Sequence, residues 1–298
     1  MYDLAKNSLT TLKHHCKKLL LGETVSMPTL IILGAQKSGT TAIYTYLSKH
    51  PNIQAPKRKE LNYFSTISQG TANIDQYLAL FPRNYARRST AVSIDASPSY
   101  LIDCERCVGH AEFLGLGFKY LVSLREPVER AVSAWFMYKQ LQQRNPNWFV
   151  AERWVETFQI LGKRLVRRDS SFGNSFAADI ETEIEVLEQG KRIECPIVEF
   201  GLYQAQLDAL YSTVDASRVM LIDSQHLRDH TQRCLSEALA FMELADHQYK
   251  PSDLTPQFVG QNAYSLEESQ LLPLKKFYEI HNKDLHHRFP SAKHWQDS

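Results

Sequence analysis

The chain has 298 residues, of which 43% are hydrophobic and 22% are charged, and its formal net charge is +1. This composition is typical of a globular domain with a large core, and it excludes a disordered or strongly basic chain. Charge alone therefore predicts no surface for nucleic acid or another polyanion.

Residues 1–26 are predicted to form an amphipathic lead-in helix. Lysines and histidines interrupt this segment and its apolar run Leu19–Leu21 is too short to span a bilayer, so we expect neither a membrane anchor nor a signal peptide. The five cysteines, an odd number, then indicate reduced thiols and a cytoplasmic location. Cys104 and Cys107 form a single C-x-x-C pair. We interpret them as incidental thiols rather than a redox pair or half a metal site, because no second pair follows.

A strand, a glycine loop and a helix start follow one another after residue 29. Leu30–Leu33 predicts a buried strand, Gly34–Gly39 a tight loop, and residues 40–49 a helix. The backbone N–H groups of the loop and the positive end of the helix dipole meet at one place and form an anion-binding site. The spacing fits the first half of a nucleotide-triphosphate P-loop, but Thr40-Thr41 replaces Lys-Ser/Thr and the lysine lies inside the loop, at Lys37.

Downstream, strands and helices alternate, which predicts a parallel sheet covered on both faces. Pro273 is expected to kink or break the last helix. The predicted strands are Ala91–Asp95, 119–124 and Arg218–Asp223, and the predicted helices are 127–143, Glu199–Ser212, Leu227–Leu244 and Ser265–His281.

A second motif follows the strand at 119–124. Arg125 stands at the carboxyl end of that strand, Pro127 suits the first turn of the next helix, and Ser133 lies about two turns into it, with Arg130 near the same face. In an open α/β sheet, strand ends and the helix starts that follow them line the ligand crevice.

Together the two motifs resemble those of sulfotransferases that use 3′-phosphoadenosine 5′-phosphosulfate (PAPS). Gln36-Lys37-Ser38-Gly39-Thr40-Thr41 resembles the 5′-phosphosulfate loop of that family, and the order Arg-x-Pro-x-x-Arg-x-x-Ser resembles its 3′-phosphate motif. The resemblance implies that Gln36, Lys37, Ser38, Gly39, Thr40 and Thr41 bind the 5′ side of PAPS. It also implies that Arg125 and Ser133 bind the 3′-phosphate, that adenosine 3′,5′-bisphosphate is the product, and that no metal is needed.

The resemblance also implies two catalytic residues. Lys37 is expected to stabilise the departing phosphate oxygens. Glu60, within a segment that resembles the Lys-Glu-x-x-x-Phe stretch of heparan-sulfate and other glycan sulfotransferases, is expected to take the acceptor proton from a site where burial raises its pKa. A solvated run of charges is the alternative interpretation of this segment. His50 is the rival candidate for the base, but at the end of a helix it is interpreted as a structural cap.

Three further segments resemble family features without giving firm assignments. Asp95–Tyr100 resembles the central strand-end motif, but Ala96 replaces a lysine that several glycan-directed relatives carry, which argues against a glycan substrate. Ser97 and Tyr100 could line the site, or Ser97-Pro98 could only end the strand. Tyr203 could lie near the cofactor or in the core. The loop Thr255–Asn262 lacks the basic residues of the family's carboxyl-terminal loop.

We therefore predict an α/β fold with a P-loop-like central parallel sheet flanked by helices and a helical insertion on the acceptor side. Residues 1–298 are predicted to form one domain, divided into a cofactor-binding half at 27–143, a helical insertion that forms the acceptor lid at 144–195, and the remaining core at 196–298. The predicted activity is sulfuryl transfer to a hydroxyl or amine of a small or medium acceptor, such as an alkaloid natural product. A glycan or lipid acceptor is the first alternative, followed by a P-loop phosphotransferase and a non-catalytic nucleotide-binding module.

Overall fold

The computed structural model describes residues 24–25, 27–68, 70–84, 92–145, 165–168, 170–255 and 266–295. The predicted lead-in helix therefore lies almost entirely outside the described residues. Most of the loop Thr255–Asn262 and residues 146–164 of the predicted insertion also lie outside them.

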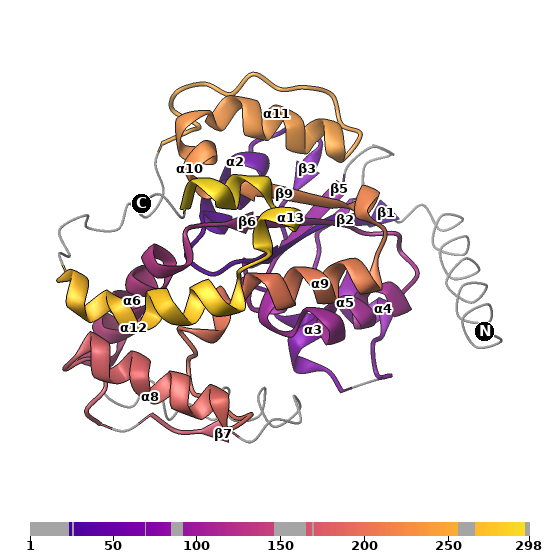
Figure 1. The fold of residues 1–298 in the computed structure, drawn as a ribbon. Coiled ribbons are helices and arrows are strands. Elements are labelled where there is room, and N and C mark those ends of the chain that lie inside the picture. Colours follow the sequence, from indigo (N-terminus) through magenta and orange to yellow (C-terminus); the bar gives the residue numbers. More distant parts are fainter. Residues whose placement is uncertain are drawn as a thin grey trace.

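A five-stranded parallel sheet forms the centre of the molecule, in the order β3-β5-β2-β6-β9 (Figure 1). This confirms the predicted fold class. The three strands predicted downstream of the glycine loop appear within one residue of their expected bounds. The sheet strands are β2 (Met27–Gly34), β3 (Ile53–Gln54), β5 (Val92–Ala96), β6 (Lys119–Leu124) and β9 (Val219–Asp223).

Helices cover both faces of this sheet (Figure 1). On one side lie α2, α10 and α11, and on the other side lie α3, α5 and α9, while α6, α8 and α12 pack together beside the sheet. The helices are α2 (Thr40–Leu47), α3 (Tyr63–Thr66), α4 (Ile74–Leu78), α5 (Cys104–Phe113), α6 (Pro127–Arg144), α8 (Phe176–Glu188), α9 (Tyr203–Thr213), α10 (Ser224–Asp229), α11 (Thr231–Phe241), α12 (Glu268–His281) and α13 (Leu285–Arg288).

Short strands and 3₁₀ turns lie between these helices in the sequence. β1 pairs antiparallel with β4, and β7 pairs parallel with β8. They are β1 (Thr24–Val25), β4 (Arg83–Asn84), β7 (Leu165–Val166), β8 (Arg192–Ile193) and the 3₁₀ turns η1 (Pro98–Asp103), η3 (Glu199–Gly201), η4 (Ala216–Arg218) and η5 (Pro290–Trp295).

The apolar run in β2 is continuous because both faces of the strand are buried. Leu30 and Ile32 pack into the cluster with α2 and α11, whereas Ile31 and Leu33 pack into the cluster with α5 and α9. All four side chains are at most 1% exposed. Burial of each such side chain is worth about 1.5–3 kcal/mol, so the strand that carries the glycine loop is firmly anchored.

Three of the predicted helices differ from the structure. The predicted helix Glu199–Ser212 is the 3₁₀ turn η3 followed by α9, because Leu202 leaves the helical conformation. The predicted helix Leu227–Leu244 is two helices, because His230 leaves the helical conformation and the Thr231 hydroxyl donates to the carbonyl of Leu227 at 2.8 Å. Pro273 does not break α12. The capping box of Glu267 and Gln270 fixes the start of this helix, and the proline removes only one backbone donor from it.

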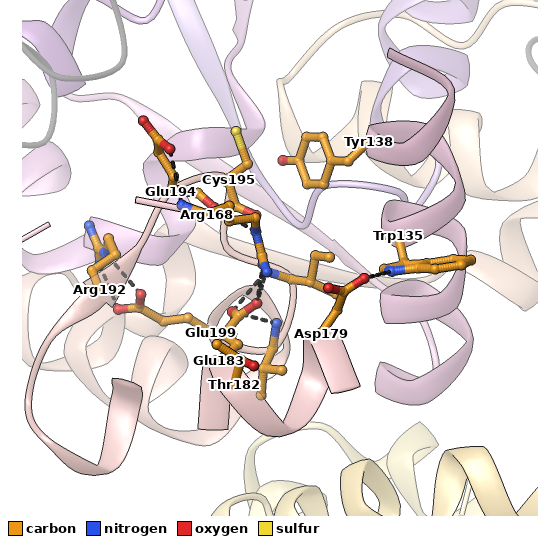
Figure 2. Close-up of polar contacts among 12 residues, drawn as sticks. Trp135, Tyr138, Arg168, Asp179, Thr182, Glu183, Arg192, Glu194, Cys195 and Glu199 are labelled. Atoms are coloured by element: carbon orange, nitrogen blue, oxygen red, sulfur yellow. Dashed lines mark hydrogen bonds and ion pairs between the residues drawn. The ribbon is translucent and has the colours of Figure 1, made fainter. Parts of the chain in front are cut away.

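The described part of the predicted insertion, residues 165–195, is not all helical. It consists of α8 and the β7–β8 ladder, held against the core by buried ion pairs (Figure 2). Glu183 on α8 accepts the N–H groups of Ile197, Val198 and Glu199 at 2.7–3.1 Å and pairs with Arg168 at 2.6 Å. The glutamate thereby satisfies the first N–H groups of η3, which explains why the chain turns there before α9 begins.

A second buried pair ties the same turn to η1. Arg192 forms two parallel hydrogen bonds of 2.7 Å with Glu199 and pairs with Asp103 at 2.9 Å. Both side chains of the first pair are at most 6% exposed. Buried pairs of this kind need both partners, because a single remaining charge has no compensation in the core.

We expect Glu183→Ala to lower the free energy of unfolding by about 3–5 kcal/mol, because it leaves Arg168 and three backbone N–H groups buried without their acceptor. Urea unfolding measures this change. Glu185→Ala is the control, since Glu185 is an exposed carboxylate on the same helix. Equal unfolding midpoints for the two variants would contradict the assigned role of Glu183.

Candidate active site

The loop after β2 has the conformation of an anion-binding loop. Lys37 and Gly39 adopt left-handed backbone angles, with φ values of 68° and 83°. Two hydrogen bonds tie the loop to the neighbouring strand β6: the N–H of Ala35 donates to the carbonyl of Ser123 at 2.7 Å, and the Ser123 hydroxyl donates to the carbonyl of Ser38 at 2.5 Å. The loop is thus fixed by the end of the next strand.

Helix α2 begins at this loop without a side-chain cap. Its N-cap is Gly39, which has no side chain, and Thr40 and Thr41 form its first turn. The positive end of the helix dipole and its first N–H groups are therefore available to an anion. The hydroxyl oxygen of Ser38 is also buried without a hydrogen-bond partner among the described residues.

The cations of the two sequence motifs converge on this loop. Burial lowers the pKa of Lys37, and the nearby guanidinium groups of Arg125 and Arg130 lower it further. Like charges are held together in this way where an anion balances them. The charges of Lys37, Arg125 and Arg130 thus act on one another, although Lys37 and the two arginines are far apart in the sequence.

Arg130 is a site residue to which the sequence analysis assigns no role. Its side chain is completely buried, and one terminal nitrogen donates to the carbonyl of Ile197. Its Nε and the other terminal nitrogen have no partner among the described residues, so a buried cation near Lys37 keeps unused donors. The sequence signal was the second arginine of the Arg-x-Pro-x-x-Arg motif.

The other predicted cofactor residues lie on the same elements. Gln36 exchanges hydrogen bonds with the hydroxyl of Tyr138 on α6, at 2.9 and 3.2 Å, which joins the loop to that helix. Arg125 forms an exposed pair with Glu129 through two of its nitrogens, at 2.9 and 3.0 Å, and keeps its remaining donors. Ser133 is half-buried on α6.

Glu60 lies in the loop after β3, beside the end of β5, which is the neighbour of β2 on the side opposite β6. Its N–H donates to the carbonyl of Ala96 at 3.1 Å, and its backbone is left-handed, with a φ of 61°. Its carboxylate pairs with Lys59 at 2.7 Å and its side chain is 53% exposed. The expectation of a buried carboxylate is therefore wrong, because the turn directs the side chain toward solvent.

His50 is structural, as expected, but it does not act as a charged cap. Its Nδ1 accepts the N–H of Asn52 and its Nε2 lies 3.1 Å from the carbonyl of Ala245, which it can reach only as a donor. Burial lowers its pKa, so the ring is neutral near pH 7. Both ring nitrogens are thus engaged in backbone hydrogen bonds.

Behind the Glu60 segment lies a buried carboxylate, that of Asp95, which is completely shielded from solvent. Ser97 and Tyr100 donate hydrogen bonds to it and are themselves buried, so neither lines an open site. Ala96 is only 1% exposed. These three residues support the segment that carries Glu60 rather than forming its surface.

Two further candidates are core residues. Tyr203 is completely buried at the start of α9, and burial raises its pKa to about 12, while the charge of Arg130 opposes that shift. Tyr203 thus packs in the core directly behind the glycine loop. Cys104 and Cys107 are buried free thiols, and burial raises the pKa of Cys104 to about 12. Within the described ranges, no group of three or more His, Cys, Asp or Glu side chains could hold a metal ion.

A separate groove of about 850 Å³ lies between α5 and α9. Arg106, His110 and Gln206 are among the residues in its wall, but none of the predicted site residues is. Among the described helices, none is long and apolar enough to cross a membrane.

The chain is similar in sequence and in fold to known sulfotransferases. The family model described as a sulfotransferase domain matches residues 27–258. The membrane-associated sulfotransferase kil1 of Dictyostelium discoideum is 31% identical over 42% of this chain and 26% of its own length. The bifunctional heparan sulfate N-deacetylase/N-sulfotransferase 1 of Caenorhabditis briggsae is 24% identical over 76% of this chain and 24% of its own length.

The chain thus matches only about a quarter of the length of these two relatives. Among solved structures, a sulfotransferase from Alicyclobacillus acidocaldarius superimposes with a TM-score of 0.64 at 22% identity. That match covers 91% of this chain and all of the other, and it shows a shared fold.

Proposed function

Because the chain belongs to the sulfotransferase domain family, we propose that it transfers the sulfuryl group of PAPS to a hydroxyl or amine of an acceptor. The observation that carries this proposal is the convergence of Lys37, Arg125 and Arg130 on a left-handed glycine loop. A dianionic phosphate is the natural partner of such a group of poorly solvated cations.

The residues present fit a donor with phosphates at both ends. The uncapped start of α2, the Ser38 hydroxyl and Lys37 would hold the 5′ side, with Gln36, Gly39, Thr40 and Thr41 completing that loop. Arg125 and Ser133, at the start of α6, would hold the 3′-phosphate. PAPS, when bound, supplies an activated sulfuryl group and a phosphate leaving group.

Residues of the chain itself would then stabilise the leaving group and accept the proton of the acceptor. Lys37 would stabilise the oxygen from which the sulfuryl group departs, because its pKa is lowered and its charge is poorly solvated. Glu60, exposed at the neighbouring strand end, would accept the proton of the acceptor. Lys59 would keep that carboxylate oriented through their 2.7 Å pair.

For the acceptor we propose a small or medium polar molecule, such as a natural product. The net charge of +1 and the buried Ala96, which replaces a lysine of glycan-directed relatives, both support this class. A glycan is the second candidate, because one relative is named for heparan sulfate. The four described cysteines are free thiols, which supports the proposed cytoplasmic location.

We expect the protein to bind adenosine 3′,5′-bisphosphate more tightly than adenosine 5′-phosphate, and Arg125→Ala to weaken binding of the bisphosphate by about 1.5–3 kcal/mol. The reason is the loss of a charge-assisted hydrogen bond to the 3′-phosphate. Calorimetry measures both. Arg233→Ala is the control, since this arginine is 70% exposed on α11 and pairs with Glu237 at 2.9 Å. Equal affinities for the two nucleotides would contradict a 3′-phosphate site.

We expect Glu60→Gln to lower turnover about 10²–10⁴-fold with unchanged bisphosphate affinity, because it removes a general base and leaves the phosphate loop intact. Lys37→Ala should lower both turnover and affinity. Turnover is followed as release of adenosine 3′,5′-bisphosphate from PAPS with a hydroxyl acceptor.

Glu243→Gln is a closely matched control for Glu60→Gln. Glu243 is also exposed, has a left-handed φ of 60° and pairs with a lysine at 2.6 Å. That lysine, Lys119, begins β6, so the control lies at the opposite edge of the sheet from the site. Full turnover by Glu60→Gln combined with a loss in His50→Ala would move the base to His50.

A further inference from the structure

The segment that carries Glu60 depends on a carboxylate that cannot itself reach an acceptor. Asp95 is completely buried at the end of β5. Three hydroxyl groups donate to it: Ser97 at 2.7 Å, Tyr100 at 3.1 Å and Tyr77 at 3.2 Å. Both oxygens of this buried carboxylate accept hydrogen bonds, and the carboxylate fixes the direction in which each hydroxyl proton points.

Two of these hydroxyls also accept hydrogen bonds from the chain just after Glu60. The Ser97 oxygen accepts the N–H of Asn62 at 3.0 Å, and the Tyr100 oxygen accepts the N–H of Phe64 at 3.3 Å. A hydroxyl has one proton and two lone pairs. Because Asp95 takes the proton of each, the lone pairs of both oxygens face the backbone of the Glu60 segment.

The same segment has a conformation that needs external support. Glu60 and Asn62 both have positive φ values, 61° and 53°, which are uncommon for residues other than glycine. The N–H of Glu60 is held by the carbonyl of Ala96, next to Asp95 in β5. The Ser99 hydroxyl also donates to the side-chain oxygen of Asn62 at 2.8 Å. Every one of these contacts comes from residues 96–100, at the end of β5.

Charged and titratable groups around Asp95 influence whether its carboxylate is ionised, which is the state that accepts the three hydroxyl hydrogen bonds. Burial raises the pKa of Asp95 to about 6, while Ser97, Tyr100, Tyr77 and, through its charge, Lys59 oppose that shift. Tyr44 on α2 faces the same carboxylate, which raises the pKa of that phenol further. Asp95 is therefore ionised near pH 7 despite complete burial, and Lys59 lies in the field of both Asp95 and Glu60.

We propose that Asp95 is a positioning residue for sulfuryl transfer: its carboxylate orients the Ser97 and Tyr100 hydroxyls, which hold the segment that presents Glu60 to the acceptor. The inference rests on the proposed function for the role of Glu60. The hydrogen-bond chain from Asp95 to Asn62 and Phe64 is independent of that role, so it can be tested separately.

The first test is amide hydrogen exchange across residues 57–66. In Asp95→Asn at least one of the three hydroxyls meets an N–H donor instead of an oxygen, and we expect exchange at Glu60, Asn62 and Phe64 to be about tenfold faster or more. Ser97→Ala should speed exchange mainly at Asn62, and Tyr100→Phe mainly at Phe64. These two variants keep the proposal testable if Asp95→Asn folds poorly.

Asp179→Asn is the matched control. Asp179 is also a buried carboxylate with two donors, the indole of Trp135 at 2.7 Å and the N–H of Gly173 at 2.8 Å (Figure 2). It lies on α8, so its loss should leave exchange at Glu60, Asn62 and Phe64 unchanged. Wild-type exchange rates in Asp95→Asn, Ser97→Ala and Tyr100→Phe would overturn the proposal. Equal acceleration of exchange in the control Asp179→Asn would also overturn it.

The second test links the segment to turnover. We expect Asp95→Asn to lower release of adenosine 3′,5′-bisphosphate from PAPS, with 2-naphthol or a heparosan oligosaccharide as acceptor, about 10–100-fold. Its affinity for the bisphosphate should stay within about twofold. In the Glu60→Gln background the same substitution should have almost no further effect, because the two residues act as one unit.

The outcomes separate the two proposals. Unchanged turnover in Glu60→Gln would remove the base assignment, whereas the exchange data would still decide whether Asp95 holds the segment. Loss of turnover in Glu60→Gln but not in Asp95→Asn would overturn the positioning role alone. Full additivity of the two substitutions would also overturn it.

Discussion

The parallel pairing of β2 with β5 on one side and β6 on the other is the constraint on which the candidate site depends. Ile32 is opposite Ala96 in one neighbour and Leu121 in the other. The three strands therefore end at the same edge of the sheet. The loops at this edge are each hydrogen-bonded to a neighbouring strand. The N–H of Ala35 bonds to β6, that of Ser97 to β2, and that of Glu60 to β5. A displacement of one strand end would thus move all three loops.

The charged residues at this edge of the sheet differ between the β6 side and the β5 side. On the β6 side Arg130 is fully buried and Lys37 has a lowered pKa, so the protein holds cations in a state that an anion would relieve. On the β5 side Lys59 and Glu60 form an ion pair whose carboxylate is half exposed. The first arrangement suits tight binding of a phosphate, and the second suits a carboxylate that must meet a changing partner.

The fold and the position of the glycine loop could be predicted from the sequence because their signals are local. Leu30–Leu33, the glycine spacing and the Arg125-x-Pro127 motif each specify a strand end or helix start within a few residues. Arg130 and Asp95 were not assigned roles because theirs depend on distant partners. Arg130 bonds to Ile197, and Asp95 collects hydroxyls from α4 and η1. The apolar periodicity of the sequence encodes neither the backbone conformation of His230, which separates α10 from α11, nor the left-handed turn that exposes the Glu60 side chain.

A buried ion pair of the described insertion also supports a residue next to the proposed phosphate site. Arg168 and Glu183 form a buried ion pair (Figure 2), and Glu183 fixes the turn at Ile197–Glu199. The carbonyl of Ile197 in turn receives a hydrogen bond from Arg130. A segment beside the sheet therefore supports the buried arginine next to Lys37. Two charged residues at this edge of the sheet, Glu60 and Arg130, are thus each supported by a segment that a buried carboxylate holds through hydrogen bonds. That carboxylate belongs to Asp95 for Glu60 and to Glu183 for Arg130. Buried charges that are individually costly thus become useful, because they fix the position of groups that must remain free to react.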